Sequence, residues 1–359
     1  MLDHNTNTSV AAGKAGLGFG TSSSSSSSSS GGGGGGGGGG SGSGGASHSK
    51  ESTGSSMYDQ PELYDEVFGF RNFEAEVAFV RAAYSRHCKG RPLETALELG
   101  CGPARHATLL AKSGVRVWAL DASAAMLDYA RRLAGQAGAD VTFVEGDMAG
   151  FGIEVRELLL LLLLLLLLLL GCKADTFCMS VPKPCWQMWR GLEGRLDLAM
   201  CLLGTFSHMT TNDQAAAAFA SVAKHLRPGG VLLLELAHPG DLFDGTLMIG
   251  DEGGEMWEAD SASQGGKLLI EWGAAGDDFN PATQVLRRTV SVCCMEGGEP
   301  GEQLHECVVP QRSFTLQELD LLGRLSGLKL AGAYGDLDLK VGLTHEDAYR
   351  LVVALVKQG

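Results

Sequence analysis

The stretch ALELGCGPARHATLL, Ala96 to Leu110, joins an apolar run to a glycine-containing turn and then to a helical pattern. A strand, a turn and a helix in this order are typical of nucleotide-binding α/β proteins, because glycine lets the backbone approach a ligand and the first helical turn offers free N–H groups. A dinucleotide fingerprint requires a third glycine at the position of Arg105, and no Gly-Lys-Ser/Thr of a P-loop follows. The turn therefore predicts a nucleotide-like ligand of another kind.

Around this turn, short apolar runs alternate with helical patterns along the chain. Strands separated by helices imply parallel pairing with right-handed crossovers, and near-continuous apolar runs such as Val231–Leu236 fit strands that are buried on both faces. We therefore predict an α/β fold with a doubly wound, mostly parallel, seven-stranded Rossmann-like sheet. The predicted strands are 95–99, 115–120, 141–145, 196–202, 231–236, 328–335 and 349–357, and the predicted helices are 105–112, 124–136, 212–226 and one that Thr315 caps, after one or two helices within 58–85.

The pattern changes between about His238 and Gln311, where apolar and polar residues alternate between Gly- and Pro-containing turns. This alternation predicts a small antiparallel sheet. We expect residues 57–237 and 312–359 to form the main domain and residues 238–311 to form an antiparallel cap over the substrate. Residues 1–56 hold an all-serine and an all-glycine run, which bury almost no apolar surface, so this segment is predicted to be a disordered tail.

Thirteen consecutive leucines, Leu158–Leu170, lie within a predicted low-complexity insertion at 152–191. About 20 apolar residues are needed to span a bilayer, so we predict no transmembrane span. A loop insertion is the main interpretation, and a short helix that binds a membrane surface or a partner is the alternative. The amino terminus lacks the features of a secretory signal, which favours a cytoplasmic location. Its serine-rich, acid-poor composition leaves an organelle such as the chloroplast as the alternative.

Charge and cysteine content narrow the class of protein. The net charge is −14 and the sequence has no run of basic residues, which argues against a nucleic-acid partner. Nine cysteines, an odd number, fit a reducing compartment. Cys172, Cys178 and Cys185 lack the CxxC spacing of common zinc sites, so we expect free thiols and no bound metal.

Three acidic residues near the turn indicate the ligand. Glu98 precedes the turn, where its carboxylate would repel a pyrophosphate and attract an ammonium group. Asp121 ends the following strand, where an acid can accept hydrogen bonds from both hydroxyls of a ribose. Asp147 ends the next strand and can accept from the exocyclic amine of adenine, while Met148 offers a soft surface to its ring. Together these residues predict a ligand that contains an adenosine with free ribose hydroxyls and a cationic amino-acid tail.

That ligand is S-adenosylmethionine, and these motifs resemble those of the class I S-adenosylmethionine-dependent methyltransferases. The family's acid-x-Gly-x-Gly motif matches Glu98–Gly102, with Ala104 in place of a third glycine. The segment LYDEVFGFRNFEAEV resembles the amino-terminal helix that closes over the cofactor, with Tyr64 near its methionine end. The Asn/Asp-Pro-Pro-aromatic tetrad of nucleic-acid amine methyltransferases is absent at Cys201–Gly204. The resemblance implies that the cofactor contacts are Tyr64, Glu98, Gly100, Cys101, Gly102, Asp121, Ala122, Met126, Asp147, Met148 and Leu202.

The resemblance also implies the reaction, which is methyl transfer by in-line displacement at the sulfonium to a small molecule or to a protein side chain. A base is needed only when the acceptor must lose a proton. His208 and His238 follow the carboxyl ends of strands, where ligands bind, and are the candidate bases. Arg105 and His106 receive no role. From residue type, Trp257, Trp272, Arg287 and Arg312 are candidates for the acceptor pocket.

Two alternatives from other functional classes remain open at this point. One is a catalytically silent module that keeps the cofactor site, or only its fold. Such a module would interact with a partner through the tail and the leucine run. The other, which Arg105 disfavours, is a NAD-dependent oxidoreductase. The sequence indicates no oligomeric state.

Overall fold

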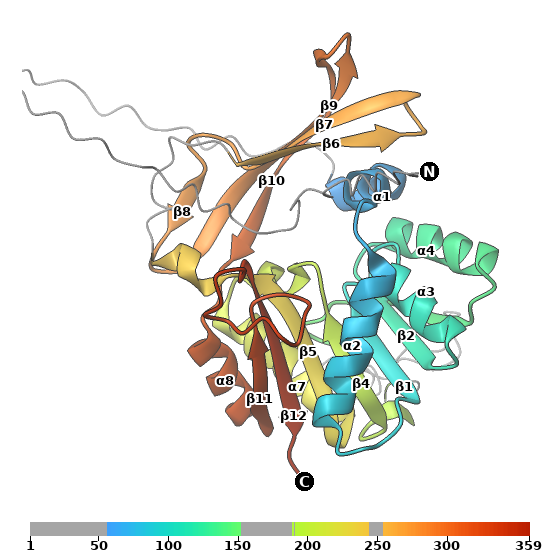
Figure 1. Cartoon of the computed structure of the whole chain (residues 1–359), viewed down its shortest axis with the longest axis vertical. Helices are drawn as coiled ribbons and strands as arrows, with labels where there is room; N and C mark the ends of the chain where they lie inside the picture. Colours follow the sequence, from blue (N-terminus) through green and yellow to red (C-terminus); the bar gives the residue numbers. More distant parts are fainter. Residues whose placement is uncertain (1–55, 152–188, 190, 244–253) are drawn as a thin grey trace, which may run out of the picture.

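The computed structural model describes residues 56–151, 189, 191–243 and 254–359, which form two β-sheets with flanking helices (Figure 1). The remaining residues, 1–55, 152–188, 190 and 244–253, lie outside this description. The predicted tail and leucine insertion fall almost entirely on them, as do Cys172, Cys178 and Cys185, so these interpretations stay sequence predictions. Among the described residues, no helix is long and apolar enough to cross a membrane.

A seven-stranded sheet forms the main body, and its strand order is β11-β12-β5-β4-β1-β2-β3. The pairs β5–β4, β4–β1, β1–β2 and β2–β3 are parallel, whereas β12 is antiparallel to both of its neighbours. The doubly wound, mostly parallel sheet is thereby confirmed. The strands are β1 (Thr95–Leu99), β2 (Arg116–Asp121), β3 (Val141–Glu145), β4 (Leu196–Cys201), β5 (Leu226–Ala237), β11 (Leu328–Tyr334) and β12 (Arg350–Lys357).

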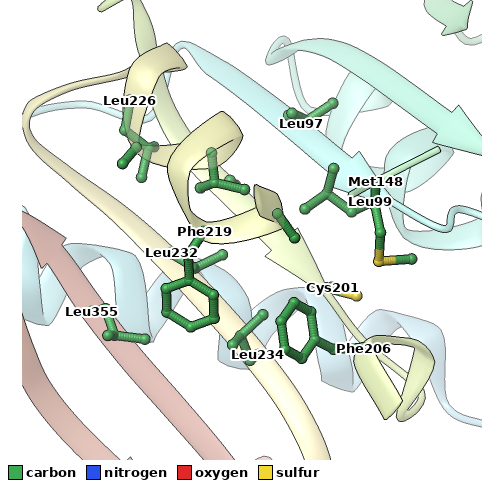
Figure 2. Packing of buried hydrophobic residues seen from close by; sticks show 14 of the residues in the cluster. Leu97, Leu99, Met148, Cys201, Phe206, Phe219, Leu226, Leu232, Leu234 and Leu355 are labelled. Carbon is green, nitrogen blue, oxygen red and sulfur yellow. The ribbon is translucent and has the colours of Figure 1, made fainter. Parts of the chain in front are cut away.

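Helices cover both faces of this sheet, and the alternation of residues along β5 shows how. Leu232 and Leu234 pack in one hydrophobic cluster with Phe219 (Figure 2), whereas Val231 and Leu233 belong to the cluster on the other face. Burial of each such side chain contributes about 1.5–3 kcal/mol. Helices α7 (Asn212–His225) and α8 (Leu316–Leu325) supply the first cluster, and α2 (Phe73–His87), α3 (Arg105–Lys112) and α4 (Ala124–Gln136) supply the second.

A separate antiparallel sheet, also confirmed, lies across the carboxyl ends of the parallel strands (Figure 1). One of its faces, with Leu268, Ile270 and Val292, packs against Val67 and Phe68 of α1 (Pro61–Phe68). Helix α1 therefore lies between the two sheets. The strands of this second sheet are β6 (Glu255–Ser261), β7 (Gly266–Trp272), β8 (Asp278–Asn280), β9 (Val285–Glu296) and β10 (Glu299–Arg312).

The local predictions hold closely, with one difference at the start of β5. The sequence predicted a break at Pro228-Gly229-Gly230 and a strand from Val231, but β5 begins at Leu226. The pairing with β4 moves from Leu226 directly to Val231, so the Pro-Gly-Gly segment is an irregularity within the strand. The capping box at the start of α8 is confirmed, because the Thr315 side chain accepts from the Glu318 N–H and the Glu318 carboxylate accepts from the Thr315 N–H.

Candidate active site

The carboxyl ends of the central strands border a cavity of about 470 Å³. Ligands bind at this edge of open α/β sheets. Among the described residues, three aspartates and no Lys or Arg line the cavity, so this part of the lining favours a cationic ligand. Trp272 and Gln311 of the second sheet form part of the opposite wall. Of the residues selected from the sequence, those that line the cavity are Tyr64, Gly100, Gly102, Asp121, Ala122, Asp147, Met148, His208 and Trp272.

The glycine turn after β1 is built from three left-handed residues. Gly100 has φ = 59°, Gly102 has φ = 51° and Ala104 has φ = 55°. A methyl group at Gly100 would lie 2.3 Å from Thr205 Cγ2, so this position excludes any side chain. The Cys101 N–H donates to the Leu120 carbonyl at 2.9 Å, which fixes the turn against the end of β2. The backbone of the turn is consequently held open toward the cavity.

Asp121 lies at the tip of β2 and is already partly satisfied by the protein. Its Oδ2 accepts from the Gly102 N–H at 2.8 Å and its Oδ1 accepts from the Ser123 N–H at 2.9 Å. Burial raises the pKa of Asp121, although these N–H donors act in the opposite direction. The backbone of Ala122 also bonds to this carboxylate. A carboxylate has about four lone-pair sites, so about one remains for a ligand donor.

Asp147 and Met148 follow β3 and border the same cavity. The Asp147 side chain is exposed, and its Oδ1 accepts from the Ala149 N–H at 2.8 Å. Within the described part of the chain its Oδ2 has no hydrogen bond. Met148 is almost buried, and its terminal methyl lies near the position that a Gly100 side chain would occupy. This pair thus offers one free acceptor beside an apolar surface.

A hydrogen-bonded pair, Tyr58 and His208, stands on the side of the cavity that faces the second sheet. The Tyr58 Oη and the His208 Nε2 are 2.8 Å apart, and the rings meet edge to face. His208 also bonds to the backbone of Pro310, which has no N–H, so the imidazole donates to that carbonyl. Nε2 is then the acceptor of the neutral ring. Burial lowers the pKa of His208 and raises that of Tyr58, so both are uncharged at neutral pH.

Solved structures of other proteins share this architecture. One is an S-adenosylmethionine-dependent methyltransferase from Clostridium acetobutylicum, with a TM-score of 0.57 at 14% identity, covering 85% of this chain and 100% of that one. Another is an amino pentose methyltransferase from Micromonospora echinaspora in complex with S-adenosylmethionine, with a TM-score of 0.52 at 18% identity, covering 86% and 100%. These likenesses show the fold.

Comparison of the sequence with those of known proteins finds similarity to methyltransferases. A family model described as a methyltransferase domain matches residues 96–167, which include the glycine turn and two of the three cavity aspartates, Asp121 and Asp147. A curated relative, the cypemycin N-terminal methyltransferase of Streptomyces sp, is 25% identical over 289 residues, or 78% of this chain and 90% of the relative. The chain is a class I S-adenosylmethionine-dependent methyltransferase. Its methyl donor is S-adenosylmethionine, and neither the silent module nor the NAD-dependent oxidoreductase is supported.

In this methyltransferase, Glu98 lies behind the glycine turn, on a recess of about 30 Å³. Its Oε2 accepts from the Ala107 N–H at 2.9 Å and its Oε1 lies 3.1 Å from His106 Nδ1. His106 Nε2 lies 2.7 Å from Glu76 Oε2. Burial alone would lower the pKa of His106, but its bonds to Glu76 and Glu98 raise it to about 9. His106 is therefore a buried cation between two carboxylates, a role that the sequence analysis missed.

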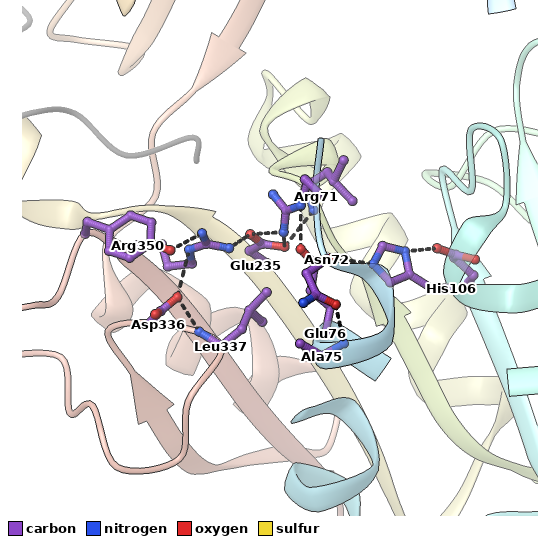
Figure 3. A network of polar contacts seen from close by, with 12 residues as sticks. Arg71, Asn72, Ala75, Glu76, His106, Glu235, Asp336, Leu337 and Arg350 are labelled. Carbon is purple, nitrogen blue, oxygen red and sulfur yellow. Dashed lines mark hydrogen bonds and ion pairs between the residues drawn. The ribbon is translucent and has the colours of Figure 1, made fainter. Parts of the chain in front are cut away.

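The same ionic network continues across the sheet to β12 (Figure 3). Arg71 Nε donates to Glu76 at 2.7 Å, and its Nη2 donates to Glu235 at 3.0 Å. Arg350 also bonds to Glu235. Burial would raise the pKa of Glu235, but Arg71 and Arg350 lower it to about 2. Glu235 in addition accepts from the N–H of Leu203, a cavity residue at φ = 55°. The network thus joins the segment before α2 to the cavity wall.

Arg105, to which the sequence analysis also gave no role, links α3 to α1 beside the cavity through an ion pair. Its guanidinium pairs with Asp65 of α1, and the Tyr129 hydroxyl donates to the same carboxylate at 2.8 Å. Tyr64, the next residue toward the amino terminus, borders the cofactor cavity. An arginine in place of the dinucleotide motif's third glycine therefore holds the helix that covers the ligand.

A second, smaller cavity of about 50 Å³ adjoins the first, because Trp272 and Gln311 line both. Arg312 and Ser207 border it, and both side chains are about 8% exposed. Arg312 Nη2 donates to Glu318 at 3.0 Å, yet its Nε and the Ser207 Oγ have no hydrogen-bond partner among the described residues. Both atoms are themselves buried, in residues that form the cavity wall.

Some predicted contacts lie elsewhere. Cys101 and Leu202 border the recess behind the turn, and Met126 is a buried residue of α4. His238 borders neither cavity, because its Nδ1 accepts from the Gly240 N–H and its Nε2 lies 3.0 Å from the Leu343 carbonyl. Of the residues chosen for the acceptor pocket, Trp272 and Arg312 border the smaller cavity, whereas Trp257 and Arg287 do not.

Proposed function

We propose that this methyltransferase transfers the methyl group of S-adenosylmethionine, by in-line displacement, to an amine nitrogen of a small molecule. The cofactor's sulfonium supplies an activated methyl group when bound. Asp121 would hold the ribose hydroxyls, and Asp147 with Met148 would hold the adenine. The turn from Gly100 to Gly102 and Tyr64 would surround the amino-acid portion. The supporting observation is the placement of these residues around one cavity at the strand tips.

The charge around the cavity supports an amine as the acceptor. Its three aspartates and the absence of Lys and Arg from its lining favour cationic ligands over anionic ones. The curated relative is named for methylation at an N-terminus, and one structural relative, KedS8 from Streptoalloteichus sp, is a sugar N-methyltransferase, with a TM-score of 0.54 at 16% identity over 89% of this chain and 100% of that one. An amine on a small molecule fits both names and the enclosed space beneath the second sheet.

Tyr58 and His208 are suited to remove the proton that amine methylation releases. An amine nitrogen that gains a methyl group has one proton to lose. The Tyr58 hydroxyl can accept that proton while it donates its own to His208 Nε2, 2.8 Å away. The neutral ring that burial imposes on His208 leaves this nitrogen available. His208, and not His238, is consequently the proposed base.

The smaller cavity would hold a second group of the acceptor. Among the described residues, the buried Arg312 Nε and Ser207 Oγ have no hydrogen-bond partner. The cavity volume of about 50 Å³ exceeds the roughly 10–15 Å³ that one water requires. One 3₁₀ turn, η3 (Thr205–His208), presents Ser207 to this cavity and His208 to the larger one. An acceptor with an amine and a nearby oxygen group, such as a carboxylate or hydroxyl, would reach both.

Methyl transfer from labelled cofactor to a panel of small amines, read by mass, tests the activity. We expect His208→Gln to lower kcat by about 10²–10⁴-fold, the usual contribution of a positioned base, with the affinity for S-adenosylhomocysteine unchanged. His345→Gln, which changes an exposed histidine on the β11–β12 loop, is the matched control. Methylation of alcohols or thiols with all amines left unmodified would overturn the proposed acceptor.

A further inference from the structure

A cleft of about 1040 Å³ lies at the edge of the seven-stranded sheet opposite the cofactor cavity. It is bordered by the end of α2, the start of β11 and the end of β12, at the amino ends of the parallel strands (Figure 1). Among the residues that the structure describes, its lining contains no Asp or Glu side chain. The cationic side chains on it are Arg86, Lys89, Arg91, Lys329 and Lys357.

These five cations have no acidic partner within the described part of the chain. Arg91 donates to the Pro228 carbonyl at 3.1 Å and Lys357 Nζ donates to the Ser326 carbonyl at 3.4 Å, and neither bond neutralises a charge. The dipole of α2 accounts for a cation such as Arg86 at its carboxyl end. It does not account for Lys329 and Lys357, which come from two other elements.

The concentration of positive charge contrasts with the rest of the molecule. The chain carries a net charge of −14, and its sequence has no basic run. The five cationic residues come together only in the folded chain, from three separate segments. Like charges in a concave surface repel one another and raise the local concentration of anions. A bound anion would relieve that repulsion. The cleft therefore has the electrostatics of an anion site.

We propose that this cleft binds a small compound with several phosphate charges. Its volume is at the upper end of the range for small-molecule sites, about 300–1,000 Å³. Its two arginines can donate bidentate bonds to phosphate oxygens and its three lysines supply point charges. Gly90 and Gly229, at φ = 81° and 78°, have open space where a side chain would stand, so the backbone there is accessible.

The lining favours a phosphate compound over a single-stranded nucleic acid. Proteins that bind such strands stack bases on aromatic rings, and no Phe, Tyr or Trp is among the described residues that line this cleft. His87 is present, but its Nε2 lies 2.8 Å from the buried Tyr334 hydroxyl, and burial together with the Arg86 charge lowers its pKa. His87 thus adds no charge at neutral pH and is fixed at the cleft wall.

Calorimetric titration of the full chain with inorganic tripolyphosphate, at constant ionic strength, tests the site. We expect one saturable site, weakened roughly fivefold by Lys329→Gln and again by Lys357→Gln, the factor for one unit charge at about 4 Å in water. Lys340→Gln, which removes an exposed lysine from the β11–β12 loop, is the matched control and should leave the affinity unchanged. Affinity for S-adenosylhomocysteine should be the same in all variants, because none of these lysines borders the cofactor cavity.

Three results would overturn the proposal. The first is no saturable binding at millimolar tripolyphosphate, and the second is equal weakening by Lys340→Gln. The third is tighter binding of an oligothymidylate than of tripolyphosphate through the same two lysines, which would assign the cleft to nucleic acid. The site is independent of the methyl acceptor, so the test stands whether or not an amine is methylated.

Discussion

His106 should make the stability of the methyltransferase depend on pH in the alkaline range. Its pKa is about 9 in the folded chain, where it lies between Glu76 and Glu98, against 6.5 for an unperturbed histidine. A group whose folded pKa is raised contributes stability that is fully present below the unfolded pKa. That contribution is lost as pH rises through the folded value, so the loss should occur between about pH 6.5 and 9.

The size of the effect follows from the same two pKa values. A rise from 6.5 to about 9 corresponds to about 3 kcal/mol of preferential binding of the proton by the folded state. The His106 side chain is 2% exposed, so solvent screening is small. His106→Gln keeps a polar side chain of similar size and removes the charge, which leaves the Glu76 and Glu98 carboxylates without the cation between them.

Urea unfolding from about pH 6 to pH 10 measures this contribution. We expect His106→Gln to be about 3 kcal/mol less stable than the wild type near pH 6 and to approach it near pH 10, because the wild-type ring is then neutral. His345→Gln, at an exposed site, should follow the wild type throughout. A difference between wild type and His106→Gln that stayed constant over this range would refute the charged state that we assign to His106.

Three further variants probe the site and its supports. Asp121→Ala should weaken S-adenosylhomocysteine binding by at least tenfold in calorimetry, because hydrogen bonds to a charged group contribute about 1.5–3 kcal/mol each. Ala104→Gly should raise the free energy of unfolding in urea by about 0.5–1 kcal/mol, because a left-handed φ costs a non-glycine residue about 1–2 kcal/mol and the added glycine freedom offsets part of that gain. Arg71→Met should lower the free energy of unfolding by about 3 kcal/mol, because Glu76 loses a buried cationic partner while Glu235 keeps Arg350. Equal values for variant and wild type would contradict the corresponding assignment.

The fold was predictable because its signals are local. The bounds predicted for β1, α3, α4 and β3 agree with the structure, since a run of apolar residues between turns specifies each of them. Asp121 was placed at the cavity for a similar reason, because it ends a strand and such ends gather at one edge of the sheet. Two of its backbone donors are Gly102, on the adjacent turn, and Ser123, the N-cap residue of the next helix.

The ionic network, and the choice between the two candidate bases, were not predictable in the same way. Glu76, Glu98 and His106 come from different elements, and no spacing in the sequence indicates that they meet. Tyr58 precedes the first helix and reaches His208 across 150 residues. His208 and His238 both follow strands, but the segments after these strands run in different directions. His208 therefore lines the cavity, whereas His238 contacts two backbone groups outside it.

Helix α1 connects the chemistry of the two sheets. Two neighbouring residues of α1 contact different parts of the molecule. Asp65 pairs with Arg105 of α3, beside the cofactor cavity. Glu66 accepts hydrogen bonds from Ser261 and Ser263 of the second sheet. Tyr64, beside them, borders the cavity itself. A displacement of α1 would therefore disturb the cofactor wall and the position of the cap together. In the proposed complex the acceptor lies between those two surfaces, so the helix beside the cavity would also determine how closely the acceptor approaches the methyl donor.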